Sequence, residues 1–241
     1  MTEGRDPVDD AVAGVRLRVG VAVPAAGSGR RMGNVKKAFL ELAGEPVLLR
    51  ALRPFLADGR VARVVVALAP DDAAAPPEWL TGADPRVEIV RGGATRGASV
   101  AACLEALPED VQIIAVHDAA RPLVPASVVR RCIDVAASGV GAVAGCPVVD
   151  TMKVVDREAF VRSTPERSTL WHAHTPQVFP AEALRRAYAT SDESATDDAS
   201  LVEAQGLRIQ MVDDGALNPK ITRPGDVALG EAILAASGGP S

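Results

Sequence analysis

Short apolar runs rich in valine and isoleucine recur along this chain and alternate with segments of helical periodicity. Most of these runs are almost continuously apolar, which is typical of strands buried on both faces of a largely parallel sheet. The predicted strands are 18–23, 61–68, 87–90, 113–116, 140–144 and 207–212, and the predicted helices are 46–56, 98–107, 127–137 and 181–189. This alternation predicts a three-layer α/β domain.

Composition limits the class of protein further. The 241 residues are 48% hydrophobic, enough for one substantial core, and we expect a single domain over residues 19–236. Residues 1–18 lack the apolar core of a secretory signal and are expected to form a disordered tail. The net charge of -5 argues against a general nucleic-acid binder, and no apolar run reaches the roughly 18 residues of a membrane span. Three cysteines without CxxC spacing are expected to be core thiols, and we expect a cytoplasmic location.

Residues 148–175 break the strand–helix alternation. This segment combines short polar–apolar alternation with turn residues and several cations, which is typical of an extended β-arm. Such a projection cannot build its own core, so we expect it to pack on a second subunit of a homodimer.

A strand, a loop of small residues and a group of cations follow one another between residues 21 and 37. Gly27, Gly29 and Gly33 leave the backbone free to approach a phosphate closely. The cations of this segment are Arg30, Arg31, Lys36 and Lys37. A glycine turn used only for packing is the alternative, whereas a Walker loop is excluded and a dinucleotide-binding fingerprint lacks its third glycine. We interpret the segment as a loop that holds a nucleoside triphosphate.

Three other motifs follow predicted strands or lie near the end of the chain. They are Gly92–Ser99, His117–Pro122 and Asn218–Thr222. Because ligands collect beyond the carboxyl ends of the strands in open α/β sheets, we expect these motifs to meet the first loop at one edge.

Asp118 follows a buried strand and needs a partner. Mg²⁺ shared with substrate phosphates is one candidate, and pairing with Arg121 or capping of the next helix is another; both can hold at once. Gly93 with Arg96 favours ligand contact at a helix N-terminus, although Ser99 alone fits ordinary capping equally well.

His172 and His174 form a His-x-His pair, but no acidic or third histidine neighbour within their segment completes a metal site. Packing near Trp171 is the favoured interpretation, and we assign these residues no catalysis. The sequence also offers no Ser-His-Asp or Cys-His constellation. A nucleophile supplied by the substrate fits nucleotidyl transfer, in which the protein provides position and positive charge.

Seven motifs in order over residues 19–235 resemble the 2-C-methyl-D-erythritol 4-phosphate cytidylyltransferase family. They are Pro24–Met32 with Lys37, Gly92-Gly93 with Arg96, Val116–Pro122, Asp150–Lys153, Thr175-Pro176-Gln177, Thr196–Ala199 and Lys220-Ile221-Thr222. The resemblance implies a Rossmann-like nucleotidyltransferase fold, and condensation of CTP with methylerythritol phosphate in the non-mevalonate isoprenoid pathway. Mg²⁺ and a homodimer are implied with it.

The resemblance also implies roles for individual residues. The catalytic residues would be Arg31, Lys37, Arg167 and Lys220. The CTP site would comprise Pro24, Ala25, Ala26, Gly27, Ser28, Gly29, Gly92, Gly93, Arg96, Ser99 and Asp118. The methylerythritol phosphate site would comprise Asp118, Arg121, Thr151, Arg167 and Thr175, with Thr151 and Arg167 serving the neighbouring subunit, and Asp118 would bind the metal.

Lys36, Ala38 and Ala94 depart from the family pattern, in which Pro, Gln and a polar residue are common at these positions. Three alternatives stay open: a cytidylyltransferase for ribitol 5-phosphate or another polyol phosphate, a molybdenum-cofactor guanylyltransferase, and a nucleotide-binding module without catalysis. The family's four cations at positions 31, 37, 167 and 220 argue against the last.

Overall fold

A computed structural model describes residues 17–27, 37–190, 197–215 and 217–236. The strands are β1 (Val19–Pro24), β2 (Glu41–Leu42), β3 (Glu45–Pro46), β4 (Val61–Leu68), β5 (Val87–Arg91), β6 (Ile113–Val116), β7 (Gly141–Pro147), β8 (Val154–Val155), β9 (Val161–Ser163), β10 (Trp171–Pro180) and β11 (Ile209–Asp213). The helices are α1 (Val47–Leu56), α2 (Pro70–Ala74), α3 (Glu78–Thr81), α4 (Arg96–Ala106), α5 (Ala126–Ala137), α6 (Ala181–Thr190), α7 (Asp198–Glu203) and α8 (Pro224–Ala236), with 3-10 turns η2 (Lys37–Phe39) and η3 (Arg167–Thr169).

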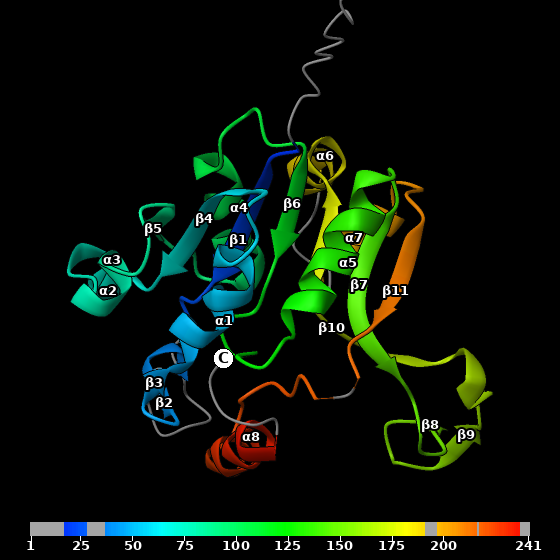
Figure 1. The fold of residues 1–241 in the computed structure, drawn as a ribbon. Coiled ribbons are helices and arrows are strands. Elements are labelled where there is room, and N and C mark those ends of the chain that lie inside the picture. The colour runs from blue at the N-terminus through cyan, green and yellow to red at the C-terminus, as the bar shows by residue number, and fades with distance from the viewer. Residues whose placement is uncertain (1–16, 28–36, 191–196, 216, 237–241) are drawn as a thin grey trace, which may run out of the picture.

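Seven strands form one central sheet in the order β11-β7-β10-β6-β1-β4-β5 (Figure 1). All neighbouring pairs are parallel except those of β10, which runs antiparallel to β6 and to β7. The predicted mostly parallel α/β fold is therefore confirmed.

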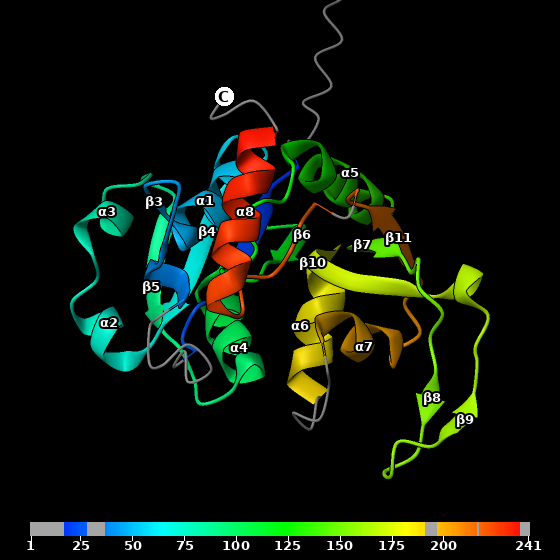
Figure 2. The same ribbon diagram turned by 90° about the horizontal axis from the view of Figure 1, so that it is seen from below.

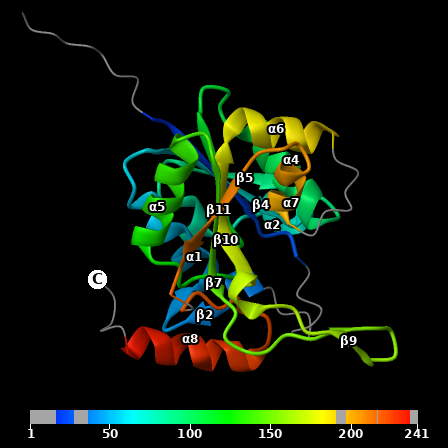
Figure 3. The same cartoon turned by 90° about the vertical axis from the view of Figure 1, so that its right-hand side faces the viewer.

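Helices cover both faces of the sheet (Figure 3). On one face, buried residues of α1 and α5 share a core cluster with alternate residues of β1 such as Val21 and Val23. On the other face, buried residues of α4, α6 and α7 share a second cluster with Ala22 and Val65. Side chains such as Phe55 are fully buried in these layers, and each buried side chain of that size is worth roughly 1.5–3 kcal/mol.

The predicted strands 61–68 and 113–116 have the observed bounds, and the other predicted elements differ from the observed ones by a few residues at their ends. Strand β10, helix α8 and the short helices α2, α3 and α7 were not predicted from the sequence. The start of β10 lies in the segment that was predicted to be the arm. The strand was not recognised there because Trp171–Thr175 is largely polar, and the strand becomes continuously apolar only from Val178. Helix α8 belongs to a small separate cluster with Leu42, Val47 and Ile221.

The predicted arm leaves the body between β7 and β10 (Figure 2). Its tip is the antiparallel hairpin β8–β9. Large apolar side chains on it face solvent, with Val149 75%, Phe160 66% and Val161 59% exposed. Across the part of the chain that the structure describes, no helix has the length and apolar character needed to span a bilayer.

Candidate active site

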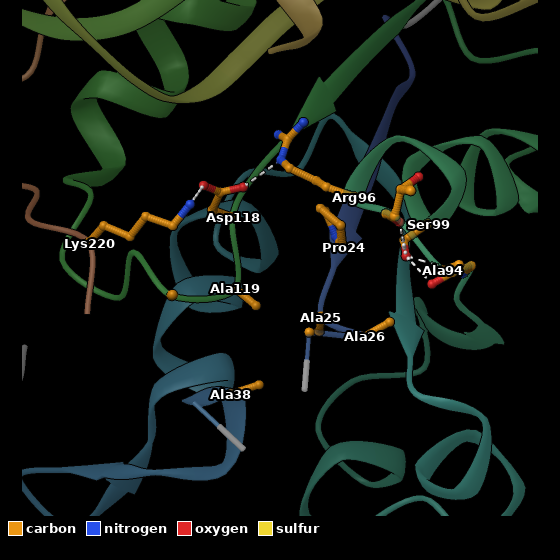
Figure 4. Close-up of a pocket in the computed structure, with 14 residues that line it drawn as sticks. Pro24, Ala25, Ala26, Ala38, Ala94, Arg96, Ser99, Asp118, Ala119 and Lys220 are labelled. Carbon is orange, nitrogen blue, oxygen red and sulfur yellow. Dashed lines mark hydrogen bonds and ion pairs between the residues drawn. The ribbon is translucent and has the colours of Figure 1, made fainter. Parts of the chain in front are cut away.

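One pocket opens at the edge of the sheet where several strand ends meet (Figure 4). It is lined by Pro24, Ala25, Ala26, Gly27, Ala38, Gly93, Ala94, Thr95, Arg96, Ser99, Asp118, Ala119, Ala120 and Lys220. The loops after β1, β5 and β6 therefore converge as expected, and Lys220 reaches the same pocket from near the other end of the chain.

The walls formed by the first two loops are backbone. The N–H of Ala25 donates to Ala67 O (2.8 Å), and the N–H of Gly92 donates to Leu68 O (2.7 Å). A Cβ at Gly92 would lie 2.5 Å from the Cβ of Ala26, so only glycine lets the two loops touch. The loops are therefore in contact at Ala26 and Gly92, and their neighbours Ala25, Gly27, Gly93 and Ala94 line the pocket.

Helix α4 starts at this pocket. Its N-cap is Thr95, whose Oγ1 accepts from the N–H of Ala98 (3.0 Å). Ser99 is therefore not the cap: its hydroxyl donates to Thr95 O (2.9 Å) and accepts from the N–H of Gly93 (3.2 Å), which shapes the glycine loop. The positive end of the helix dipole faces the pocket and favours an anion there.

Asp118 lies between two cations of the pocket (Figure 4). Its Oδ1 accepts from Arg96 Nε (3.0 Å) and its Oδ2 from Lys220 Nζ (2.6 Å). Burial alone would raise the pKa of Asp118, but the charges of Arg96 and Lys220 outweigh burial and hold that pKa well below its usual range. Asp118 is thus an anion that orients the side chains of both Arg96 and Lys220. The side-chain pairing of Asp118 with Arg121, which was one alternative from the sequence, is not formed.

Arg96 has a second anchor in Asp198, at the start of α7. The guanidinium donates two hydrogen bonds to the Asp198 carboxylate, at 3.1 and 2.7 Å, and the hydroxyl of Tyr188 donates to the same carboxylate (2.5 Å). The carboxylate of Asp198 has no exposed surface. Two carboxylates therefore orient Arg96 before any ligand binds.

His117 fixes the hydrogen bonds of Thr175. A carbonyl oxygen only accepts, so His117 Nε2 carries the proton that is donated to Arg121 O (3.0 Å). His117 Nδ1 must then accept from the Thr175 hydroxyl (3.1 Å), which itself accepts from the N–H of Asp118 (3.0 Å). Burial lowers the pKa of His117 to about 4, which keeps the ring neutral. Thr175 thus has one lone pair left and can only accept from a substrate hydroxyl.

Arg121 and Asn218 carry hydrogen-bonding groups that nothing satisfies within the described residues. Arg121 Nη1 donates to Asn218 O (2.6 Å), but its buried Nε has no partner there. The Asn218 amide donates to Thr175 O (2.9 Å) and to Asp214 Oδ2 (3.0 Å), which leaves its Oδ1 open within the same part of the chain. A buried donor and a buried acceptor are costly unless something meets them.

The remaining predicted site residues either lie away from this pocket or are not among the residues that the structure describes. Ser28, Gly29, Arg31 and Lys36 lie outside the described residues. Lys37 begins η2 beside Ala38, which lines the pocket, but its side chain is not described. Thr151 and Arg167 are exposed on the arm, where Arg167 Nη1 donates to Val149 O (2.7 Å).

The roles of Asn218, Asp198 and Asp214 were not predicted from the sequence. Asn218 and Asp198 belong to motifs named above, but only the fold shows their partners. No acidic residue of its own segment lies beside His174, but the fold brings one from elsewhere: Asp214, which directly follows β11, has its Oδ2 2.7 Å from His174 Nδ1.

A three-layer α/β sheet with a glycine-lined pocket, a helix N-terminus and two cations held by a carboxylate at its edge is the arrangement of a nucleotidyltransferase. The model of the 2-C-methyl-D-erythritol 4-phosphate cytidylyltransferase family matches residues 19–236. The chain belongs to this family, so the resemblance and the assignment as an enzyme are confirmed.

Relatives of the same name agree along nearly the whole chain. The one from Symbiobacterium thermophilum is 43% identical over 92% of this chain and 94% of its own length. The one from Rhodococcus opacus is 43% identical over 97% of this chain and 98% of its own. The crystal structure of the Thermus thermophilus enzyme of this name superposes with a TM-score of 0.72 at 35% identity, covering 92% of this chain and 100% of that one.

Proposed function

We propose that this chain condenses CTP with 2-C-methyl-D-erythritol 4-phosphate, releasing pyrophosphate and forming 4-diphosphocytidyl-2-C-methyl-D-erythritol, a step of isoprenoid precursor synthesis. Family membership over residues 19–236 supports the reaction. The structural observation that carries it is the meeting of Ala25–Gly27 with Lys220 and Asp118 in one pocket.

The reaction needs no protein nucleophile. A phosphate oxygen of methylerythritol phosphate, already anionic, forms a bond to the α-phosphorus of CTP while the bond from that phosphorus to the bridging oxygen breaks and pyrophosphate leaves. The barrier is repulsion between two anions, and fixed positive charge lowers it. Lys220, aimed by Asp118, supplies part of that charge, and we assign the rest to Arg31, Lys37 and Arg167.

We place the cytosine in the part of the pocket lined by Ala25, Ala26 and Gly93, where backbone peptide groups can hydrogen-bond to its edge. Ser99 acts there by shaping the loop. Methylerythritol phosphate would lie next to Asp118. The open Nε of Arg121 favours an anionic or carbonyl-like oxygen, and the open Oδ1 of Asn218 and the spare lone pair of Thr175 favour hydroxyl donors. A polyol phosphate offers both.

We propose Mg²⁺ as the cofactor, bound by Asp118 and the CTP phosphates. Asp118 fits this role, because each of its oxygens accepts one hydrogen bond and retains lone-pair capacity. Among the residues that line the pocket it is the one carboxylate. When bound, Mg²⁺ would neutralise triphosphate charge in the way that carboxylate-held magnesium does elsewhere.

We further propose a homodimer in which each arm reaches the partner's pocket. Exposed Val149, Phe160 and Val161 on the arm support burial against another surface. Thr151 and Arg167 lie on the same arm and do not line the pocket of their own chain. The three cysteines are free thiols, which suits a reducing compartment and supports our proposal of a cytoplasmic location. Cys103 and Cys132 are buried as expected, whereas Cys146 is only half-buried and is not a core residue.

Pyrophosphate release by the full chain tests the proposed reaction. We expect release with CTP, methylerythritol phosphate and Mg²⁺ together, and loss of release when GTP replaces CTP. Lys220→Ala serves as a folded, inactive control. Faster turnover with ribitol 5-phosphate would assign the enzyme to that polyol, dependence on GTP would assign it to the guanylyltransferase class, and CTP binding without release would indicate a non-catalytic module.

A further inference from the structure

Three metal-ligating side chains meet at a point outside the residues that line the pocket. Cys146 lies near the end of β7, His174 lies in β10, and Asp214 directly follows β11. One ligand atom from each of the three lies within 4.8 Å of the other two. Because β11, β7 and β10 are adjacent in the sheet, three neighbouring strands supply one ligand each.

The backbone around this cluster holds the three strands close together. The N–H of Asp214 donates to Gly145 O (2.9 Å), and His172 is the register partner of Cys146. A Cβ at Gly145 would lie 2.2 Å from the carbonyl oxygen of His172, so glycine is required for β10 to approach β7. The pairing of these strands shifts between Ala173 and Gln177, and this irregularity contains His174.

The side chains are already oriented toward one another. His174 Nδ1 and Asp214 Oδ2 lie 2.7 Å apart, and the Asn218 amide donates to the same carboxylate oxygen (3.0 Å). The Asp214 carboxylate has no exposed surface, while the side chain of His174 is 16% exposed. Cys146 Sγ completes the group of ligand atoms, all of which lie within 4.8 Å of one another.

We propose that Cys146, His174 and Asp214 form a binding site for a borderline-soft divalent cation, with Zn²⁺ as the representative ion. Thiolate, imidazole and carboxylate are the donor types that Zn²⁺ takes in proteins. Tetrahedral bonds of about 2.0–2.3 Å separate ligand atoms by roughly 3.3–3.8 Å. His174 Nδ1 and Asp214 Oδ2, now 2.7 Å apart, must therefore move apart by roughly 0.6 Å, and any pair near the 4.8 Å limit must approach by about 1 Å. The fourth position is open to water.

This cation site differs from the Mg²⁺ position proposed at Asp118. Mg²⁺ takes oxygen ligands and keeps several waters, so a site with a sulfur and a nitrogen ligand disfavours it. The two sites are connected through Asn218, which bonds both Asp214 and Thr175 O. A bound ion would therefore brace the wall beside Thr175 and Arg121 without touching the reacting atoms. The cation site itself does not depend on the proposed reaction.

Metal titration of the full chain tests the proposal. The protein carries no histidine tag, is stripped with EDTA, is kept reduced with a phosphine, and is titrated with Zn²⁺ against a chromophoric chelator and separately with Co²⁺. We expect one Zn²⁺ per chain that excess Mg²⁺ does not displace, and a thiolate-to-cobalt charge-transfer band. Cys146→Ser and His174→Ala should each weaken Zn²⁺ binding at least about tenfold, and Cys146→Ser should abolish the band.

His172→Ala is the matched control, because His172 lies two residues from His174 and beside Cys146 in register but outside the cluster. It should bind Zn²⁺ like the unmodified chain. Thermal denaturation gives a second measurement. Zn²⁺ should raise the Tm of the unmodified chain and of His172→Ala, but not that of Cys146→Ala. If Cys146→Ser does not fold, Cys146→Ala is used in its place. Substoichiometric binding, or equal loss in His172→Ala, would overturn the proposal. Unchanged affinity in both cluster variants would do the same.

Discussion

Complementation between two inactive variants tests which chain completes each pocket. Lys220 lines the pocket in the body of its own chain, whereas Arg167 is exposed on the arm and does not line that pocket. If the arm crosses a dimer, a Lys220→Ala chain still donates an intact arm, and an Arg167→Ala chain still offers an intact pocket. A mixed dimer then contains one complete site and one site with both defects.

The expected recovery follows from counting sites. Random pairing makes about half of the dimers mixed, and each mixed dimer holds one complete site of two, so the mixture should regain about a quarter of unmodified activity. Each variant alone should lose roughly 10²-fold or more, as expected for loss of a charged group that stabilises the transition state or aligns the attack. For Arg167→Ala the loss should appear mainly in the use of methylerythritol phosphate.

The assay is pyrophosphate release by a coexpressed pair, purified through two different tags so that only mixed dimers are measured. Purified mixed dimers should reach about half of the unmodified rate. Lys220→Ala paired with Lys37→Ala is the matched control, because both changes lie in the body and leave no complete site. No recovery in purified Lys220→Ala/Arg167→Ala dimers would refute the crossing arm.

Four further expectations follow from the site and the arm. Lys37→Ala and Lys220→Ala should each retain the fold by circular dichroism while kcat falls roughly 10²-fold, and near-normal turnover would remove that lysine from the mechanism. Asn218→Ala removes the amide that donates to Thr175 O and to the Asp214 carboxylate, so Tm should fall by the equivalent of about 1–3 kcal/mol. The KM for methylerythritol phosphate should rise more than the KM for CTP. An unchanged Tm would contradict the buried hydrogen-bond network. Burial lowers the pKa of His117 from 6.5 to about 4, so as pH falls the imidazole takes up a proton in the unfolded chain before it does so in the folded chain. The free energy of unfolding should therefore decline as pH falls from 6.5 toward 4, by up to about 1.4 kcal/mol per pH unit. This decline should be absent in a folded His117→Asn variant. Phe160→Ser should halve the mass measured by light scattering at low concentration, and a dimer of unchanged affinity would exclude Phe160 from the interface.

Local patterns were sufficient to predict most of the sheet. Continuous apolar runs such as 61–68 are buried on both faces, so their composition reports their structure directly. Strand β10 escaped because its first half, Trp171–Thr175, is largely polar and partly exposed, and its pairing depends on β6 and β7 rather than on its own sequence. Helix α8 escaped because its apolar residues pack on a small cluster around Ile221 rather than on the main sheet.

The site could be predicted where a residue type implies its own chemistry. Gly27, Gly93, Asp118 and Lys220 belong to motifs that were expected to meet at one edge of the sheet, and these four residues line one pocket. The partners were not predictable, because Arg96 pairs with Asp198 across 102 positions and His174 with Asp214 across 40. Such contacts depend on the strand order, which the sequence pattern alone does not supply.

The arm begins and ends on directly paired residues, because Pro147 at the end of β7 and Trp171 at the start of β10 are register partners. It is thus an insertion into what would otherwise be a tight hairpin, and both of its roots are fixed in the central sheet. A short turn could replace residues 148–170 and leave the sheet continuous. Such a shortened chain would separate folding of the body from whatever the arm contributes.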